Sequence, residues 1–317
     1  MELRNGKIGP NVFDRSVKKR IEQLDAAYDS AVLDQMAVTA DPITLRTSLG
    51  GILSVYAAVN DLSAAGAVPE IYSPVLLLPP GSAEQELRDL SDQISETARK
   101  VNVQVSGGHT EVTSAVTRPV VIGTAAGRRR PGAETGPQSW RPGAAVIMTK
   151  WIGLEGTWLL SREKRQFLEE RFPAAMLERT SAYDRWLSTV PESAAALRSG
   201  PCLLHDVSEG GIFAALWTLA QMTGTGLEID LKSIPVRQET IEYTDCFQIN
   251  PYQMESGGAL LIVTDRPEDV LREMAADGIP AARIGRLTAG NDKIIRNREE
   301  IRYLDLPQPE ALLQVLG

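Results

Sequence analysis

Two short segments of the sequence combine a histidine, a pair of glycines, and acidic or hydroxyl side chains. They are Ser-Gly-Gly-His-Thr-Glu at residues 106–111 and His-Asp-Val-Ser-Glu-Gly-Gly at residues 205–211, and they hold the only two histidines of the chain. Glycines let a backbone approach a ligand closely, and free N–H groups at the start of a helix attract anions. Either segment alone is more commonly a glycine turn with polar caps. Their co-occurrence favours a site that holds phosphate or activates a substrate.

A third feature is a set of isolated aspartates in the N-terminal half, Asp29, Asp41 and Asp61. Asp61 follows Asn60 inside a segment rich in alanine, where a carboxylate has poor helix propensity. Magnesium takes hard oxygen ligands and is often held by one or two carboxylates together with substrate phosphates. Dispersed single aspartates are therefore compatible with a Mg-nucleotide site. Helix caps and solvated charges are an even alternative for Asp29 and Asp41, and a weaker one for Asp61.

Other segments carry weaker signals. Gly-Leu-Glu-Gly at residues 153–156 is more often a helix-start turn than a phosphate loop, and the three arginines at 128–130 fit a solvated strand end. The sequence contains no Walker-type loop with Lys and Ser/Thr, no Cys/His zinc spacing and no Gly-x-Ser-x-Gly nucleophile turn. Phosphate binding would therefore have to rely on the glycine turns and the aspartates.

The elements that position these residues alternate between helix and strand, which predicts an α/β (α+β) fold. Apolar spacing and caps predict helices at 51–66, 82–100 (capped by Ser82), 155–198, 211–222 and 267–275. Strands are predicted at 70–78, 101–105, 116–126, 144–149, 202–206, 227–231, 259–263, 282–287 and 293–295. The first glycine segment then follows the end of a strand, and the second joins a strand to a helix. A loop-like stretch at 128–143 predicts two domains, 1–142 and 143–317.

Composition limits the class of protein. The chain has 317 residues and a formal net charge of −8, which argues against binding nucleic acid or an anionic membrane. No apolar run is long enough to span a bilayer, and the N-terminus lacks the apolar core of a secretion signal. Cys202 and Cys246 are too few for a disulfide framework. A cytoplasmic location is expected.

Taken in order, five motifs resemble the aminoimidazole-ribonucleotide-synthetase-like (PurM-like) superfamily, and most nearly its hydrogenase-maturation carbamoyl dehydratase branch. They are Asp-Ser-Ala-Val-Leu at 29–33, Thr-Ala-Asp-Pro at 39–42, Val-Asn-Asp-Leu-Ser-Ala-Ala-Gly-Ala-Val-Pro at 59–69, Gly-Gly-His-Thr-Glu-Val-Thr at 107–113, and His-Asp-Val-Ser-Glu-Gly-Gly at 205–211. The resemblance extends over residues 1–290. Each motif alone is unspecific, but the ordered set is specific.

This resemblance implies an N-terminal α/β domain that contributes strands to a barrel shared in a homodimer, a C-terminal α/β domain beside it, and ATP in the cleft between them. The implied metal ligands, which hold Mg²⁺ on the triphosphate, are Asp29, Asp41 and Asp61. The implied nucleotide or metal contacts are Asn60, Gly107, Gly108, His109, Thr110 and Glu111. On the substrate and phosphate side, the resemblance implies catalytic roles for His205, Asp206 and Glu209 and binding roles for Ser208, Gly210 and Gly211.

The implied chemistry is transfer of the γ-phosphoryl group of ATP to an amide or carbonyl oxygen of a small substrate. Positioning and charge neutralisation suffice for such a reaction, without a protein nucleophile. The sequence departs from its relatives at three places. It ends Leu-Leu-Gln-Val-Leu-Gly where the dehydratase branch has Pro-Arg-Ile-Cys, it has Tyr28-Asp29 where relatives often pair aspartates, and it has His109 where several relatives place Asp. A non-catalytic nucleotide-binding scaffold and a thiamine-monophosphate-type kinase are the alternatives.

Overall fold

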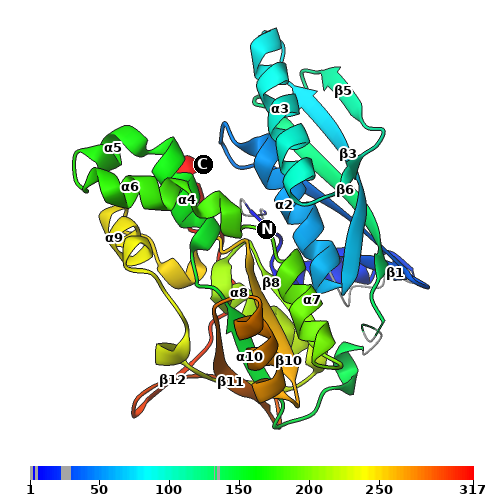
Figure 1. Cartoon of the computed structure of the whole chain (residues 1–317), viewed down its shortest axis with the longest axis vertical. Helices are drawn as coiled ribbons and strands as arrows, with labels where there is room; N and C mark the ends of the chain where they lie inside the picture. The colour runs from blue at the N-terminus through cyan, green and yellow to red at the C-terminus, as the bar shows by residue number, and fades with distance from the viewer. Residues whose placement is uncertain (1–2, 4–5, 23–29, 132, 134–135) are drawn as a thin grey trace.

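The computed structural model describes residues 3, 6–22, 30–131, 133 and 136–317. In this part of the chain the strands form two separate sheets, the first from residues before 130 and the second from residues after 144. Figure 1 shows the two sheets in two α/β lobes that contact each other through α2, α4 and α7. The fold is thus a mixed α/β fold with two domains. The exact boundary at residue 142 stays a prediction.

The first sheet has the order β1-β2-β6-β3-β4, with β5 also paired to β3. All pairs are antiparallel except those of β3 with β4 and β5. Helices α2 and α3 form a layer on one side of this sheet (Figure 1). The bounds are β1 Ala31–Leu33, β2 Met36–Ile43, α2 Gly50–Ala64, β3 Ala67–Leu78, α3 Glu84–Lys100, β4 Gln104–Val105, β5 His109–Val112 and β6 Val120–Arg129.

Helix α2 is buried almost all round, as expected for a helix of alanines, leucines and valines that lies between two layers. One side packs on β2, β3 and β6, and another contacts strand β8 of the second sheet. The helix predicted at 51–66 is confirmed, and its position between the domains brings Asn60 and Asp61 to their contact region.

The second sheet has the order β13-β12-β9-β11-β7-β10-β8, antiparallel except for β12 with β9. Alternate residues of β10, an interior strand next to the edge strand β8, enter different cores: Leu261 packs with α8, whereas Leu260 and Ile262 pack with α7 and α10. Helices therefore cover both faces, which explains strands buried along their whole length. The bounds are β7 Ala145–Thr149, α7 Val190–Arg198, β8 Leu203–Val207, α8 Gly211–Thr223, β9 Gly226–Asp230, β10 Ala259–Thr264, α10 Pro267–Ala276, β11 Ala281–Thr288, β12 Lys293–Asn297 and β13 Glu300–Tyr303.

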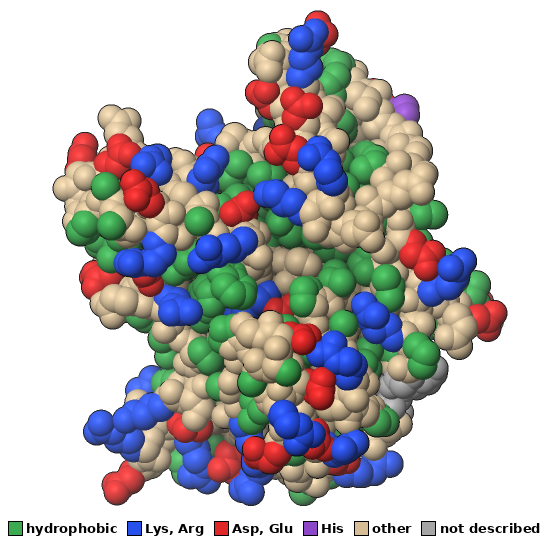
Figure 2. All heavy atoms as spheres, viewed as in Figure 1, with side chains coloured by type: hydrophobic (Ala, Val, Ile, Leu, Met, Phe, Trp, Pro, Cys, Tyr) green, Lys and Arg blue, Asp and Glu red, His purple; other side chains and the backbone are tan. Residues whose placement is uncertain are grey.

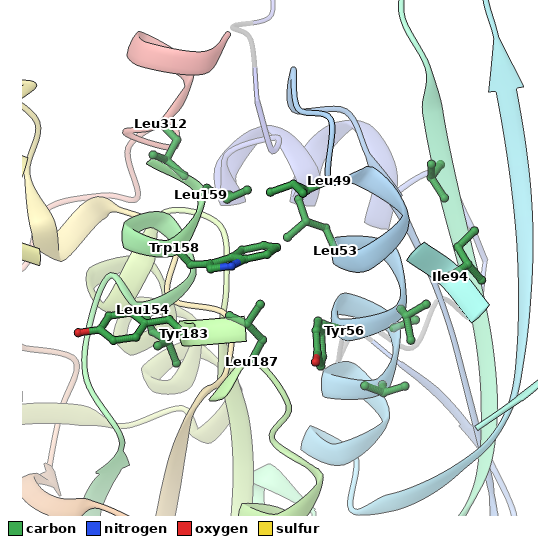
Figure 3. Packing of buried hydrophobic residues seen from close by; sticks show 14 of the residues in the cluster. Leu49, Leu53, Tyr56, Ile94, Leu154, Trp158, Leu159, Tyr183, Leu187 and Leu312 are labelled. Atoms are coloured by element: carbon green, nitrogen blue, oxygen red, sulfur yellow. The ribbon is translucent and has the colours of Figure 1, made fainter. Parts of the chain in front are cut away.

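A cluster of helices projects from the C-terminal domain and joins the two domains through a common apolar core. It contains α4 Leu154–Glu163, α5 Arg165–Glu169, α6 Ala174–Ser181, the 3-10 helix η3 Tyr183–Trp186 and α9 Gln238–Cys246. Figure 3 shows Leu49, Leu53 and Tyr56 from the α2 region facing Trp158 and Leu159 of α4. In Figure 2, hydrophobic side chains gather in the hollow between this cluster and the α2–α3 layer. No helix in the described ranges is both long and apolar enough to cross a bilayer.

The chain ends form short helices, α1 Pro10–Phe13, the π-helix η1 Asp14–Lys18 and α11 Leu313–Leu316. Three further 3-10 turns are η2 Pro137–Ser139, η4 Leu231–Ser233 and η5 Pro251–Gln253.

Several predicted elements differ from the structure. The helical region at 155–198 is broken into α4, α5, α6, η3 and α7. The predicted strand at 101–105 is wrong over its first three residues, because the chain turns there with Asn102 at φ 55°. Helix α3 begins at Glu84 after an Ala83 cap, so Ser82 does not cap it. Strands β1, β2, β5 and β13 and helix α9 were not predicted.

Candidate functional site

A cavity of about 450 Å³ lies where β8 ends and α8 begins. The polar side chains of His205 and Asp206, on the last residues of the buried strand, are only 7% and 6% exposed and line this cavity. Ser208, Glu209 and Gly210 of the following turn line it as well. Five of the residues predicted from the motif at 205–211 therefore share one cavity.

The backbone conformation of this turn explains why it contains two glycines. Gly210 and Gly211 have φ angles of 79° and 63°, in the left-handed region that favours glycine. A Cβ on Gly211 would also lie 2.7 Å from the carbonyl oxygens of Tyr252 and Met254. The N–H of Gly211 donates to the Ser208 carbonyl at 3.0 Å. The assignment of these glycines as phosphate contacts stays a prediction, and in this structure the N–H of Gly210 is also engaged.

Both ends of the chain reach this turn. The backbone N–H of Lys7 donates to Glu209 Oε1 at 2.8 Å, and residues between 7 and 15 line one wall of the cavity. Residues 306–309 line another wall, and the side chain of Glu310 follows them into the interior. Glu310 Oε2 accepts from Gly210 N at 2.7 Å, and its Oε1 accepts from Glu255 N and Leu312 N at 3.0 Å each.

The aspartates of the N-terminal domain approach the same region from α2 and β2. Asp61 is 6% exposed, and its Oδ2 accepts a 2.6 Å hydrogen bond from the Thr39 hydroxyl of β2. Because α2 packs against β8, Asp61 and Asp206 lie on contacting elements of the two domains. Asp41 is on β2 two residues beyond Thr39, close enough to Glu255 to raise the pKa of that carboxyl.

Three glutamates of the C-terminal domain lie near the turn, with Glu155 and Glu310 buried and Glu255 half-buried. Burial, together with the carboxylates of Glu310 and Asp206, raises the pKa of Glu155 to about 8. Burial also raises the pKa of Glu310 to about 7, although its three backbone N–H donors act in the opposite direction. The pKa of Glu255 is raised well above its ordinary value by burial, then by Glu155 and Glu310. A raised pKa favours the protonated form, so these carboxyls keep a proton up to a higher pH than a carboxyl in water does.

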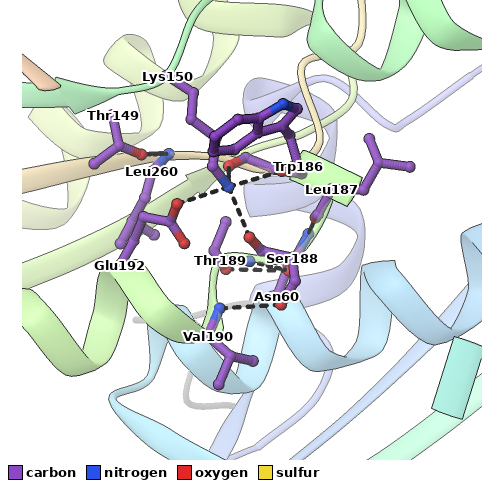
Figure 4. Close-up of polar contacts among 11 residues, drawn as sticks. Asn60, Thr149, Lys150, Trp186, Leu187, Ser188, Thr189, Val190, Glu192 and Leu260 are labelled. Atoms are coloured by element: carbon purple, nitrogen blue, oxygen red, sulfur yellow. Dashed lines mark hydrogen bonds and ion pairs between the residues drawn. The ribbon is translucent and has the colours of Figure 1, made fainter. Parts of the chain in front are cut away.

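Asn60 links the domains. Its Nδ2 donates to the Leu187 carbonyl at 2.8 Å, and its Oδ1 accepts from the Thr189 N–H and hydroxyl at 2.9 and 3.1 Å (Figure 4). The same loop is held from the other side by Lys150, whose Nζ donates to the carbonyls of Trp186 and Ser188 and pairs with Glu192 at 2.7 Å. Asn60 thereby fixes α2, and with it Asp61, against the C-terminal domain. Its role as a nucleotide contact stays a prediction.

The first glycine segment lies elsewhere. His109, Thr110 and Glu111 begin β5, which pairs with β3 at the far side of the first sheet (Figure 1). All of its residues are exposed, and His109 Nε2 lies 3.2 Å from Glu111 Oε2 in a pair whose side chains are 62% and 50% exposed. Gly108 has φ 114°, and a Cβ there would lie 2.4 Å from the Pro74 carbonyl oxygen. Within one copy of the chain, Gly107, Gly108 and the residues after them do not join the cavity.

The assignment of the aspartates as metal ligands stays a prediction. Asp41 and Asp61 lie on the neighbouring elements β2 and α2 and do not line the cavity, and Asp29 lies outside the described residues. Among the residues that the structure describes, no group of three or more His, Cys, Asp or Glu side chains is arranged to hold a metal ion alone. A metal here would need oxygen atoms from a ligand as well.

Sequence reasoning missed Glu155, Glu255 and Glu310. A signal existed for Glu155, an acid between two glycines at a helix start, where Gly257 leaves room for its carboxylate. A Cβ on Gly257 would lie 1.8 Å from Glu155 Oε2. Glu310 gave no local signal, because its partners are 55 and 100 residues away in the sequence.

The chain belongs to the AIR synthase related protein family. The N-terminal domain of that family matches residues 27–129, and its C-terminal domain matches residues 141–297. The carbamoyl dehydratase HypE of Rhizobium leguminosarum bv. viciae is 28% identical over 253 residues, which cover 78% of this chain and 70% of the relative. The resemblance to this superfamily and its hydrogenase-maturation branch is confirmed.

Solved structures agree with the fold. A HypE–HypF complex superposes with a TM-score of 0.77 at 20% identity, covering 93% of this chain and 99% of the other. HypE in complex with ATP superposes with a TM-score of 0.72 at 20% identity, covering 96% of each chain. At this identity the likeness establishes the two-domain fold.

Proposed function

We propose that this protein binds Mg-ATP between its two domains, near the contact of α2 with β8, and transfers the γ-phosphoryl group to an amide or carbonyl oxygen of a small substrate. The substrate would lie in the cavity at the start of α8. The named activity of the HypE relatives, carbamoyl dehydratase, and the ATP bound in one solved HypE support an ATP-dependent dehydration. The observation that carries the proposal is the packing of α2, which carries Asp61, against β8, which carries Asp206.

The side chains present fit a magnesium-bound triphosphate. Asp41 and Asp61 offer hard oxygen ligands, and Mg²⁺ typically takes one or two carboxylates together with phosphate oxygens. Too few acidic groups converge in the described part of the chain for a metal site without a ligand, which agrees with a metal that enters with its nucleotide. Bound Mg²⁺ would neutralise charge on the transferring phosphoryl group.

The chain's own residues would bind, orient and move protons. Asn60 and the loop at 186–189 hold α2 in register, so that Asp61 keeps its place relative to Asp206. His205 and Asp206 line the cavity and would take up or supply the proton of the reacting group, because an imidazole can do either near neutral pH. Glu209 and Ser208 would orient the substrate from the turn. The narrow fit of Gly211 against the backbone of 252–254 keeps this turn rigid.

The first experiment measures binding of a non-hydrolysable ATP analogue by calorimetry, with Mg²⁺ and with EDTA. Asp61→Asn keeps an acceptor for the Thr39 hydroxyl but removes the charge, and we expect at least a tenfold loss of Mg-dependent affinity. Asp92→Asn, on the exposed face of α3, is the matched control. Equal affinity in Asp61→Asn and the wild type would sink the proposal.

We further propose that a second copy of the chain covers the open face of the first sheet. Val38 of β2 and Ile71 of β3 both pair with Ala126 of β6 and form an apolar row opposite α2, with Val38 43% and Ile71 44% exposed. A shared barrel of two such sheets would remove this row from water.

The mass in solution tests this assembly. We expect the wild type to elute with twice the 34.5 kDa of one chain, and a Val38→Glu/Ile71→Glu variant to elute as a monomer in light-scattering chromatography. Tyr303→Glu, an exposed apolar site on the second sheet, is the control and should remain dimeric. A wild-type monomer at all concentrations would contradict the proposal.

A further inference from the structure

The N–H of Gly210, just before α8, already has a hydrogen-bond acceptor that the chain itself supplies. The carboxylate of Glu310 is 3% exposed and accepts three backbone hydrogen bonds, from Gly210, Glu255 and Leu312. Gly210 is the residue before α8 and Glu255 lies in the loop before β10, so two separate segments direct N–H groups at one carboxylate. Such convergent N–H groups at a helix start are the usual receptor for a phosphate or carboxylate ligand.

Glu310 is anchored in this place. The residues that follow it, Ala311 and Leu312, are 2% and 0% exposed and belong to the apolar core that joins the domains. On the other side, Leu304 N donates to the Lys293 carbonyl at 2.8 Å, which holds the start of the segment against β12. Withdrawal of Glu310 would expose the apolar side chain of Leu312 to water, which is unfavourable. The carboxylate is therefore fixed directly behind Gly210, which lines the cavity.

The surroundings of Glu310 oppose a second anion. Glu155, Glu209 and Glu255 are close enough to influence its charge or to be influenced by it. Lys7 and Arg15 also line the cavity, but both are exposed and belong to the N-terminal segment at its outer wall. Asp206 and Glu209 line the cavity, the Gly210 N–H is occupied by Glu310, and Ile8, Ala215 and Pro307 contribute apolar wall.

We propose that Glu310 is a specificity-determining residue: it takes the anion position at the start of α8, so that the cavity accepts an uncharged or cationic acceptor and excludes one with its own phosphate or carboxylate. This rests on the proposed function insofar as it takes the cavity for the acceptor site. It disfavours the kinase alternative, because the acceptor of a thiamine-monophosphate kinase is itself a phosphate.

The test uses inorganic phosphate as the probe on the full-length protein. Glu310→Ala removes the carboxylate and leaves the N–H groups of Gly210 and Glu255 open to an anion. We expect phosphate affinity, measured by calorimetry and by thermal shift, to be at least tenfold higher in Glu310→Ala than in the wild type. Glu310→Gln removes the charge but keeps the space filled, and we expect a smaller gain. Glu299→Ala, on the exposed turn before β13, should behave as the wild type.

The outcomes separate the two proposals. Equal phosphate affinity in the wild type and Glu310→Ala, or no binding in either, overturns the role of Glu310. If Glu310→Ala does not fold, the test uses the folded wild type and Glu310→Gln. A shift of the Gly210 amide resonance when phosphate is added to the wild type overturns the proposal. An unchanged resonance, together with a higher phosphate affinity in Glu310→Gln, supports it. Binding of the Mg-ATP analogue is measured on the same samples. Its absence from the wild type would sink the proposed function while leaving the phosphate comparison valid.

Discussion

The two glycine turns of this protein, residues 106–111 and residues 205–211, have similar sequences and opposite environments. In the second turn the histidine is 7% exposed and lines a cavity, and both chain ends reach the turn. In the first turn the histidine side chain is 62% exposed on an edge strand. A glycine pair beside a histidine therefore marks a place where the backbone must bend. Whether that place also carries chemistry depends on what packs around it.

The comparison also separates two uses of glycine. Gly211 is required because the backbone of residues 252–254 lies against it, whereas around Gly107 the nearest atom to an added Cβ is the Ser73 hydroxyl at 3.5 Å. Gly211 is thus packed against another segment, whereas Gly107 has open space beside it, although its neighbour Gly108 lies against the Pro74 backbone. Variants made in pairs at the two turns test this difference directly.

The largest effect is expected from the histidines. If His205 moves a proton in the proposed reaction, His205→Gln should lower ATP-dependent turnover by about 10²- to 10⁴-fold. His109→Gln should leave turnover within about twofold, because in one chain its side chain is far from the cavity. ADP formation under saturating Mg-ATP measures both. Similar losses in the two variants would show that the first turn also reaches an active site, for example that of a partner subunit.

The glycines should give the next largest effect. In Gly211→Ala, the left-handed φ costs about 1–2 kcal/mol and the collision with two carbonyl oxygens about 1–3 kcal/mol more. In Gly107→Ala, only the backbone term of about 1–2 kcal/mol applies, since the space beside it is open. Urea unfolding of both variants gives the two free energies. Equal losses of unfolding free energy in the two variants would mean that residues 252–254 move aside at little cost. That result would contradict the rigid turn described above.

Much of the scaffold could be predicted from local pattern. The helix at 211–222 is found as α8 Gly211–Thr223, because its apolar spacing and bounding glycines act locally. Strand β2 was missed, since Met-Ala-Val-Thr-Ala-Asp-Pro has a weak alternation and contains a proline. Its pairing with β6 stabilises the strand in the folded protein, and this long-range contact cannot be read from the local sequence.

The site was predictable to the extent that its residues lie in one motif. His205 and Asp206 sit at the end of a strand and before a helix, as their spacing indicated. Glu310 was not predictable, because it comes from a segment without regular structure and meets its donors only through the tertiary fold. The exposure of His109 could not be predicted either. Strand β5 carries no apolar residue until Val112, and the burial of its residues depends on which segments pack against it in the folded protein.

The smallest effect, and the last contrast between the two turns, concerns pH. Burial raises the pKa of Glu155 to about 8 and of Glu310 to about 7, above their ordinary value of 4.5, so the folded state binds more protons than the unfolded state between those limits. Stability from these carboxyls is therefore complete below about pH 4.5, falls as pH rises toward 8, and changes no further above it. The slope is at most about 1.4 kcal/mol per pH unit for each group.

Urea unfolding across this pH range measures the slope, and Glu155→Gln should flatten the curve because the glutamine side chain cannot ionise. Glu111→Gln, beside the exposed His109, should leave the curve unchanged and shift stability by less than about 1 kcal/mol. A wild-type curve that rises between pH 5 and 8 in the absence of ligand would show that a cation already compensates the buried glutamates, and the acidic interior of the second turn would then be a charge-paired site like that of the first.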